Sequence, residues 1–197
     1  MGLEFDYTEG QTPIDEAEKE GLKIRSISTM AELDQFEQQN IEEALLWLMR
    51  KSLKPTEVLR VDFMQQIHQR MFKQVWKWAG HFRQTNKNIG VPYYMIRQEL
   101  QHLLEDGLYW IENETFPPAE IALRFKHRLV SIHLFPNGNG RHSRLMADIL
   151  QQTSAPEQPF TWGRKTLRKG EARKKYIQAL RTADQGDITP LIAFAQS

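Results

Sequence analysis

The 197-residue chain contains no cysteine. This absence excludes disulfide bonds, thiolate metal sites and cysteine nucleophiles. Long apolar runs are missing as well: the longest extends only from Ala44 to Met49, far short of the roughly 20 residues that span a membrane. The acidic first residues contain no apolar stretch of the kind found in secretory signals. We therefore expect a cytoplasmic protein that has no membrane as a partner.

Charge is unevenly distributed, although the formal net charge is only +1. Residues 1–45 carry 12 acidic and three basic side chains, whereas residues 160–181 carry eight basic side chains and a single acidic one. Such a separation can mark a surface for nucleic acid or phosphate-bearing ligands. Two solvated faces, or an acidic arm lying on a basic helix, are the explanation that we favour. Because the basic stretch 164–175 falls in an expected helix with an apolar face, we do not expect nucleic acid as a partner.

Apolar side chains recur at helical spacing along most of the chain, which predicts a mainly α fold. Helices are expected over roughly residues 31–53, from Pro55, after Arg97, from Pro118 to before Pro136, after Gly140, around Tyr176 and after Thr189-Pro190. The exception is the segment 80–96, whose Asn, Gly and Pro residues alternate with aromatic and β-branched ones and predict a small β-hairpin flap. We divide the chain into an acidic arm with a first helix, residues 1–54, and a main domain, residues 55–197.

A glycine-rich turn between two expected helices lies in the segment 131–144, SIHLFPNGNGRHSR. Gly138 and Gly140 lack a Cβ atom, so their backbone can adopt positive φ and approach a ligand closely. The N–H groups that open the second helix have no partner within that helix and carry partial positive charge. The turn therefore predicts a binding site for an anion.

Three side chains beside this turn supply chemistry for group transfer. Arg141 and Arg144 lie three residues apart on one helix face and can bind phosphate oxygens through forked hydrogen bonds. His133, just before the turn, can act as a general base because its ordinary pKa lies near neutrality. This combination predicts transfer of a phosphate-containing group to a hydroxyl. The structural alternative is a helix–turn–helix corner with capping glycines, and a zinc hydrolase is not expected because the chain lacks His-Glu-x-x-His.

The segment from His133 to Arg144, HLFPNGNGRHSR, resembles the Fic motif, His-x-Phe-x-Asp/Glu-Gly-Asn-Gly-Arg-x-x-Arg. Other parts of the chain resemble the same family or its subgroup called mobile mystery protein B. Family-like parts are Trp78-Ala79-Gly80, the segment from Thr85 to Ile89 and the helix at Tyr176, and subgroup-like residues of the arm are Glu32-Leu33-Asp34, Glu37 and Asn40-Ile41. Members of that subgroup occur in mobile elements beside a helix-turn-helix protein. Residues 55–197 would then form a Fic domain.

The resemblance implies a Fic-type helical bundle with a β-hairpin flap, which transfers AMP from ATP to a Tyr, Thr or Ser hydroxyl of a target protein. In this interpretation His133 deprotonates the hydroxyl and Arg141 stabilises charge in the transition state, while Phe135 anchors the turn and Tyr176 borders the base pocket. The residues implied to bind the nucleotide are Gly138, Asn139, Gly140, Arg141 and Arg144. The flap residues implied to align the target backbone by strand addition are Asn86, Lys87, Asn88, Ile89 and Gly90.

Asn137 departs from the motif, because the family has an Asp or Glu there as its Mg²⁺ ligand. An amide oxygen can still coordinate a hard cation such as Mg²⁺ or Mn²⁺, so Asn137 is a candidate metal ligand, although loss of the carboxylate charge should weaken binding. One alternative is therefore a catalytically weak module that binds a nucleotide or a partner. Another is a phosphotransferase of the Doc type, but Doc has Lys where this chain has Gly140, which favours adenylylation.

Two modes of regulation remain open. Ser28-Thr-Met-Ala-Glu32 matches part of the family's inhibitory pattern, Ser/Thr-x-x-x-Glu-Gly/Asn, whose Glu pairs with the second motif arginine, but Leu33 stands where Gly or Asn belongs. A Ser followed by a Glu also begins many helices. The alternative is control by an antitoxin-like helix-turn-helix partner, with this chain as the toxin-like member of a two-protein module.

Overall fold

The computed structural model describes residues 16–156, 158–163 and 169–197. The acidic part of the arm before residue 16 and residues 164–168 of the basic stretch lie outside these ranges. The elements are α1 (Glu16–Lys19), α2 (Met30–Leu48), α3 (Pro55–Val58), α4 (Val61–Phe72), the 3-10 helix η1 (Tyr93–Met95), α5 (Ile96–Glu112), α6 (Pro118–Ile132), α7 (Asn139–Ser154), α8 (Lys169–Asp184) and α9 (Thr189–Gln196). The predicted mainly α fold is confirmed.

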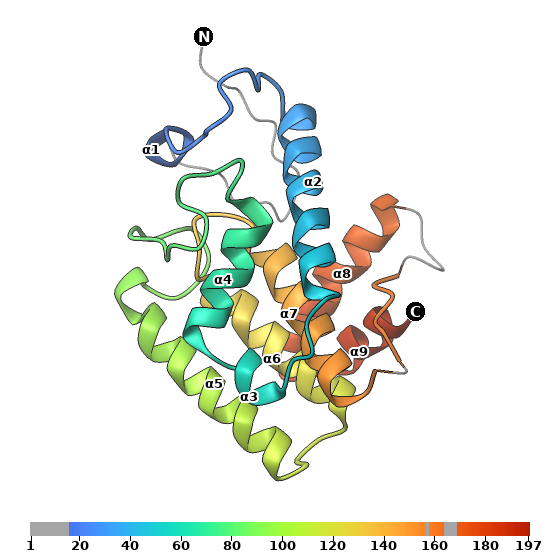
Figure 1. Cartoon of the computed structure of the whole chain (residues 1–197). Coiled ribbons are helices and arrows are strands. Elements are labelled where there is room, and N and C mark those ends of the chain that lie inside the picture. Colours follow the sequence, from blue (N-terminus) through green and yellow to red (C-terminus); the bar gives the residue numbers. More distant parts are fainter. Residues whose placement is uncertain (1–15, 157, 164–168) are drawn as a thin grey trace.

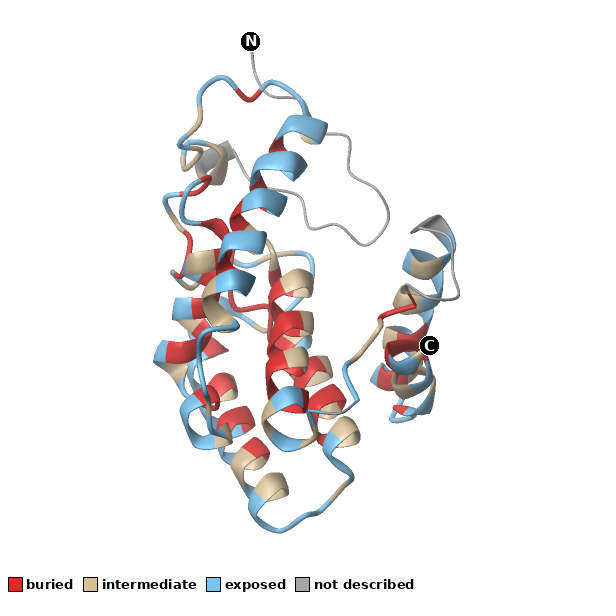
Figure 2. Ribbon diagram, turned by 45° about the vertical axis from the view of Figure 1, so that its right-hand side comes forward, coloured by how far each residue is buried: buried red, intermediate tan, exposed pale blue. Residues whose placement is uncertain are grey.

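Helices α6 and α7 form the centre of the bundle, with α4 and α5 packed around them and α2 lying along α4 (Figure 1). The apolar stripes read from the sequence are buried, for example Phe63, Ile67 and Met71 on α4. Figure 2 shows α2 with its buried side toward the bundle and its exposed side toward solvent. None of the helices within the described ranges is long and apolar enough to cross a membrane.

The helix expected from Pro55 is interrupted, which corrects the prediction of one continuous element. Helix α3 ends at Val58, and α4 begins at Val61. Between them Arg60 adopts an extended conformation, with φ −135° and ψ 145°, and its guanidinium binds the Asp62 carboxylate at 3.0 Å. The first long helix also ends at Leu48, earlier than expected.

The part of the chain that the structure describes contains no β-hairpin, which corrects the second part of the fold prediction. The described ranges contain no strand, and their one isolated β-bridge joins Leu22 of the arm to Trp76. Within the expected hairpin segment 80–96, residues 80–92 form turns and bends before η1 and α5 begin. We call residues 80–92 the flap.

The absence of a hairpin follows from the hydrogen bonds of the flap. Its two arms bind the motif segment rather than each other: the Arg83 N–H donates to the Leu134 carbonyl at 3.0 Å and the Val91 N–H to the Ile132 carbonyl at 3.3 Å. The Arg83 guanidinium, which is buried, donates to the carbonyls of Val91 and Thr85. Carbonyls that a hairpin ladder would use are therefore occupied by an arginine side chain.

Candidate active site

The turn between α6 and α7 is held in shape by its own residues. Helix α6 ends at Ile132, and the next residue, His133, caps it in the left-handed conformation with φ 60° and ψ 66°. Asn139 then locks the turn: its side-chain oxygen accepts the Phe135 N–H at 2.9 Å and its amide donates to the Phe135 carbonyl at 2.8 Å. Asn139, implied to bind nucleotide, thus also has a structural role, and Phe135 is fully buried as the resemblance implied.

The two glycines of the turn have different functions. Gly138 caps α7 with φ 78°, and a Cβ atom there would lie 2.6 Å from two ring atoms of Phe72. Gly140 lies inside α7 and does not use the positive φ that glycine allows, and a Cβ built on it would meet nothing within 4 Å. Gly138 is therefore required by the fold, whereas the fold has no need for glycine at Gly140.

The start of α7 presents donors to the open space at Gly140. No hydrogen bond among the described residues uses the N–H groups of Asn139, Gly140 and Arg141. Because these groups carry the positive end of the helix dipole, they form a site for an anion. Arg144 follows one turn later, and its guanidinium lies 5.4 Å from the ring centre of Tyr176, with no carboxylate partner in the described part of the chain.

His133 is almost fully buried, with 3% of its surface exposed. Burial and the nearby charges of Arg83 and Lys87 lower its pKa from 6.5 to about 4. Burial disfavours the charged imidazolium, and both cations repel it. His133 is therefore neutral at physiological pH, the state that a general base requires.

The flap covers His133 directly. A Cβ atom on Gly90 would lie 2.6 Å from Cβ of His133, and Gly90 has φ +96°. Arg83 ties the flap to the same residue, because its Nε donates to the His133 carbonyl at 2.6 Å. The outer flap residues Asn86, Asn88 and Ile89 are exposed. The flap thus presents an exposed outer edge beside the histidine, although not as a strand.

His68 of α4 is a site residue that the sequence analysis missed. Its Nε2 lies 3.0 Å from the Asn137 carbonyl, and its Nδ1 accepts the Gly80 N–H at 2.9 Å. The ring also stacks on Phe135, with the ring centres 3.7 Å apart. Burial lowers the pKa of His68 well below 6.5, so the ring is neutral and donates from Nε2. His68 therefore joins the motif turn to the base of the flap.

Glu37 of α2 is the second site residue that was not predicted. The sequence analysis named it only for its resemblance to the subgroup. Its side chain is 4% exposed and binds the Arg141 guanidinium at 2.6 Å, while Trp76 Nε1 donates to its other oxygen at 2.5 Å. The Arg141 guanidinium also lies 4.8 Å from the ring centre of Phe72. Glu37 therefore fixes the first motif arginine from an element 104 residues away in sequence.

Ser28 and Glu32 bind each other at the start of α2. The Glu32 carboxylate accepts the N–H groups of Ser28 and Thr29 and the Ser28 hydroxyl, as part of a capping box that begins α2. These bonds lower the pKa of Glu32. In this structure Glu32 does not contact Arg144, and the carboxylate that reaches a motif arginine is Glu37.

Tyr176 lies where α8 meets the bundle. The Lys126 ammonium lies 4.4 Å and the Arg144 guanidinium 5.4 Å from the centre of its ring. Burial raises the pKa of the Tyr176 hydroxyl to about 12. This position brings Tyr176 to the second motif arginine. Whether it also borders a base pocket stays a prediction.

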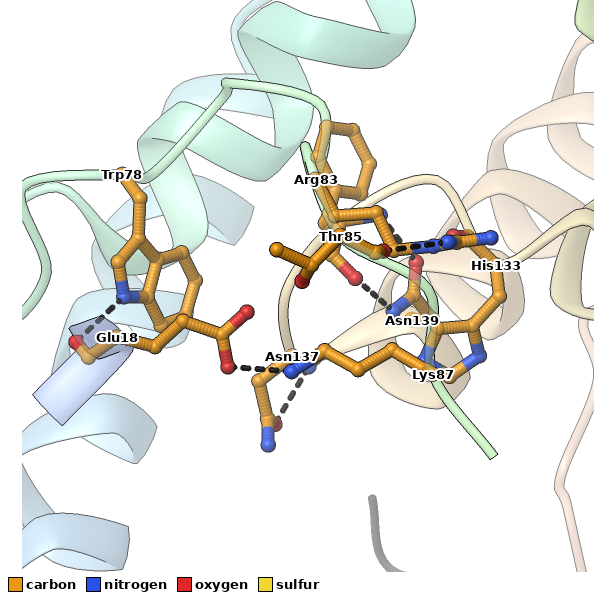
Figure 3. A network of polar contacts seen from close by, with 10 residues as sticks. Glu18, Trp78, Arg83, Thr85, Lys87, His133, Asn137 and Asn139 are labelled. Atoms are coloured by element: carbon orange, nitrogen blue, oxygen red, sulfur yellow. Dashed lines mark hydrogen bonds and ion pairs between the residues drawn. The ribbon is translucent and has the colours of Figure 1, made fainter. Parts of the chain in front are cut away.

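Lys87 points inward from the flap, unlike its neighbours. Its side chain is 3% exposed, and its ammonium lies 2.6 Å from the Glu18 carboxylate of α1. The Glu18 carbonyl in turn accepts Trp78 Nε1 at 3.2 Å. Figure 3 shows Lys87 reaching across to the motif turn, with its amine beside Asn137 and the Glu18 carboxylate.

The side chain of Asn137 is turned toward the start of α7. Its side-chain oxygen accepts the Gly138 N–H at 2.6 Å. The described residues contain no group of three His, Cys, Asp or Glu side chains that could hold a metal ion. With a neutral amide at the motif position, and with the nearby Glu18 carboxylate already bound to Lys87, these residues do not fit the divalent cation that the resemblance implies.

Comparison with known proteins agrees with this geometry. The family model described as Fic/DOC family matches residues 58–151, which include the motif, the flap and α4 to α6, so this part of the chain is similar to that family. It is 26% identical over 167 residues to Protein adenylyltransferase Fic of Nematostella vectensis. That alignment covers 82% of this chain and 37% of the relative, so the chain spans little more than a third of the relative's length.

Solved structures share the fold. The BepC protein of Bartonella tribocorum, a VirB-translocated effector with bound AMPPNP, superposes with a TM-score of 0.68 at 16% identity, covering 92% of this chain and 97% of that one. The N-terminal Fic domain of a Bartonella quintana effector with bound ADP gives a TM-score of 0.65 at 18% identity, covering 87% and 86%. The Fic-type helical fold is thus shown, and these two similar proteins bind adenine nucleotides.

Proposed function

We propose that this protein transfers AMP from ATP to a Tyr, Thr or Ser hydroxyl of a target protein. The observation that carries the proposal is the placement of a neutral, buried His133 beside the unused N–H groups at the start of α7. A base and an anion site next to each other are what transfer of a phosphate-containing group to a hydroxyl requires. Kinship with proteins named adenylyltransferases supports AMP as the transferred group.

The reaction places each group of the turn in a defined role. The target hydroxyl oxygen attacks the α-phosphorus of ATP while the His133 imidazole takes the hydroxyl proton. The bond between the α-phosphorus and the oxygen bridging to the β-phosphate breaks, and pyrophosphate leaves with the electron pair. The α7 N–H groups and Arg141 stabilise the charge that develops on these oxygens.

The two motif arginines are prepared differently for this task. Arg141 is already fixed by Glu37 and Phe72, so it does not need to be ordered when the nucleotide binds. Arg144 lies over Tyr176, has no carboxylate partner among the residues that the structure describes, and is available to a terminal phosphate. Since Arg144 lies one helical turn beyond the α7 N–H groups, a triphosphate can extend along this face.

The target protein is proposed to dock on the exposed outer edge of the flap. Strand addition uses main-chain hydrogen bonds and therefore tolerates many sequences. The Ile89 side chain, 49% exposed, offers an apolar contact beside that edge. We further propose, from the resemblance to mobile mystery protein B, a helix-turn-helix partner that controls the enzyme as an antitoxin would.

Labelled ATP tests the proposed function. Purified protein is incubated with host lysate and ATP labelled at either the α- or the γ-phosphate, with Mg²⁺ and again with EDTA, and protein-bound label is measured. We expect label from the α-phosphate only, lost in His133→Ala and kept in the control His102→Ala, which changes an exposed histidine on α5. Label from the γ-phosphate alone would favour phosphotransfer. Absence of any label would favour the alternative of a nucleotide- or partner-binding module.

A further inference from the structure

The flap carries a cation beside the residue at which the Fic motif of this chain has lost an anion (Figure 3). Asn137 replaces the acidic residue of the motif, so the turn offers one carboxylate fewer than the family pattern. Lys87 brings its ammonium to the same side of the site from the flap (Figure 3). After burial and the charge of Arg83, the charge of Lys87 also contributes to lowering the pKa of His133.

A divalent cation and the Lys87 ammonium would compete for this space. Mg²⁺ in proteins is usually held by one or two carboxylates together with phosphate oxygens. Here the amide oxygen of Asn137 is directed at the Gly138 N–H, and the nearby Glu18 carboxylate is bound to Lys87 at 2.6 Å. A metal ion at this point would face a buried positive charge without a carboxylate of the motif to balance it.

The Glu18 carboxylate also indicates what the Lys87 ammonium can bind. A carboxylate oxygen and a phosphate oxygen are alternative acceptors for the same charge-assisted hydrogen bond. The Lys87 side chain is 3% exposed and that of Glu18 is 13% exposed, so the pair lies inside the site rather than on its rim. An anionic oxygen is therefore already held beside the motif turn, near the anion site at the start of α7.

From this arrangement we infer that Lys87 takes the place of the divalent cation and binds the phosphates of the donor nucleotide without metal. The inference depends on the proposed function, because it concerns the same nucleotide site. In the free protein the Glu18 carboxylate is bound to the Lys87 ammonium. When ATP binds, its phosphate oxygens replace the Glu18 carboxylate, and Lys87 balances the charge that accumulates on the departing pyrophosphate.

Nucleotide binding tests the inference without a known target protein. ATP is titrated into the full chain by calorimetry in Mg²⁺ and in EDTA, so the readout does not depend on catalysis. For the unmodified protein we expect affinities that agree within about threefold, and for Lys87→Met a loss of about 10- to 100-fold in EDTA, the range expected for one hydrogen bond to a charged group. Lys77→Met, which alters an exposed lysine outside the site, should bind as the unmodified protein does.

Two further variants separate this role from a structural one. If Lys87 only anchors α1 through Glu18, Glu18→Gln and Lys87→Met should change ATP binding alike. Under our inference Glu18→Gln removes a competitor and strengthens binding in EDTA, whereas Lys87→Met weakens it. The double variant Lys87→Met/Asn137→Asp restores the acidic motif residue and should bind ATP more tightly with Mg²⁺ than with EDTA. Melting curves of each variant check that it is folded.

The failures of the two proposals are distinguishable. Binding of ATP by the unmodified protein only when Mg²⁺ is present would overturn the role of Lys87 and leave adenylyl transfer in place. Equal behaviour of Glu18→Gln and Lys87→Met would also overturn it. Absence of ATP binding under both conditions would overturn the proposed function and this inference together.

Discussion

The two glycines of the motif turn provide a matched pair of substitutions with opposite expected effects. In Gly138→Ala the new Cβ lies 2.6 Å from two atoms of the Phe72 ring, and the residue keeps a φ of 78°. The left-handed conformation costs about 1–2 kcal/mol for alanine. Overpacking against a buried ring adds about 1–3 kcal/mol. We expect Gly138→Ala to be destabilised by about 2–5 kcal/mol.

Gly140→Ala should leave the fold intact. Its Cβ meets nothing within 4 Å, and alanine is the better helix former by up to about 1 kcal/mol. The methyl group instead enters the open space beside the α7 N–H groups. If a phosphate occupies that space, the loss of one charge-assisted hydrogen bond should weaken ATP binding about 10- to 100-fold.

Thermal unfolding and ATP titration together check both expectations. In a chain of this size 1 kcal/mol corresponds to roughly 2–4 °C in Tm, so Gly138→Ala should melt roughly 10 °C lower than the unmodified protein. Gly140→Ala should melt at or above the unmodified Tm. A Gly140→Ala protein that binds ATP normally would refute the assignment of the anion site to this helix terminus. A Gly138→Ala protein of unchanged Tm would refute the packing argument.

Three other predictions concern the surroundings of the turn. Glu37→Gln should lower the free energy of unfolding by about 1–3 kcal/mol, because both of its donors lose a charged acceptor; urea unfolding beside the exposed control Glu43→Gln measures this, and equal stability of the two would contradict it. His133 and His142 have pKa values lowered to about 4, chiefly by burial, so the unfolded chain binds more protons between pH 6.5 and 4. Stability should therefore be full above pH 6.5 and fall as the pH drops toward 4, by about 2 kcal/mol per histidine at pH 5, and a flat profile of urea midpoints would be inconsistent with buried neutral rings. Arg83→Lys cannot reach all the carbonyls that the guanidinium binds, so limited proteolysis should cut the flap faster than in the unmodified protein; an unchanged rate would show that Arg83 does not hold it.

Much of the fold could be predicted because it depends on local sequence patterns. The stripe of α4 and the proline starts of α6 and α9 depend on residues within one or two turns of each other. The motif turn was located for the same reason, since its helix end, glycines and second helix are contiguous. The break at Arg60 was missed because the apolar period continues across it.

The contacts that complete the site could not be predicted, because their partners are distant in sequence. Glu37 meets Arg141 across 104 residues, and His68 meets Asn137 across 69. The flap was expected to pair with itself, but a hairpin pattern does not reveal that a buried Arg83 will use its carbonyls instead. For Lys87 only its place in the flap was anticipated, since burial of its charge depends on Glu18 from the arm.

The nucleotide product released during the reaction tests the central claim most directly. Attack on the α-phosphorus must release pyrophosphate, whereas transfer of the γ-phosphate must release ADP. With a hydroxyl-bearing acceptor identified by labelling, we predict one pyrophosphate for each modified acceptor and none with His133→Ala. Release of ADP in proportion to modification, or unchanged pyrophosphate release by His133→Ala, would contradict adenylyl transfer by this site.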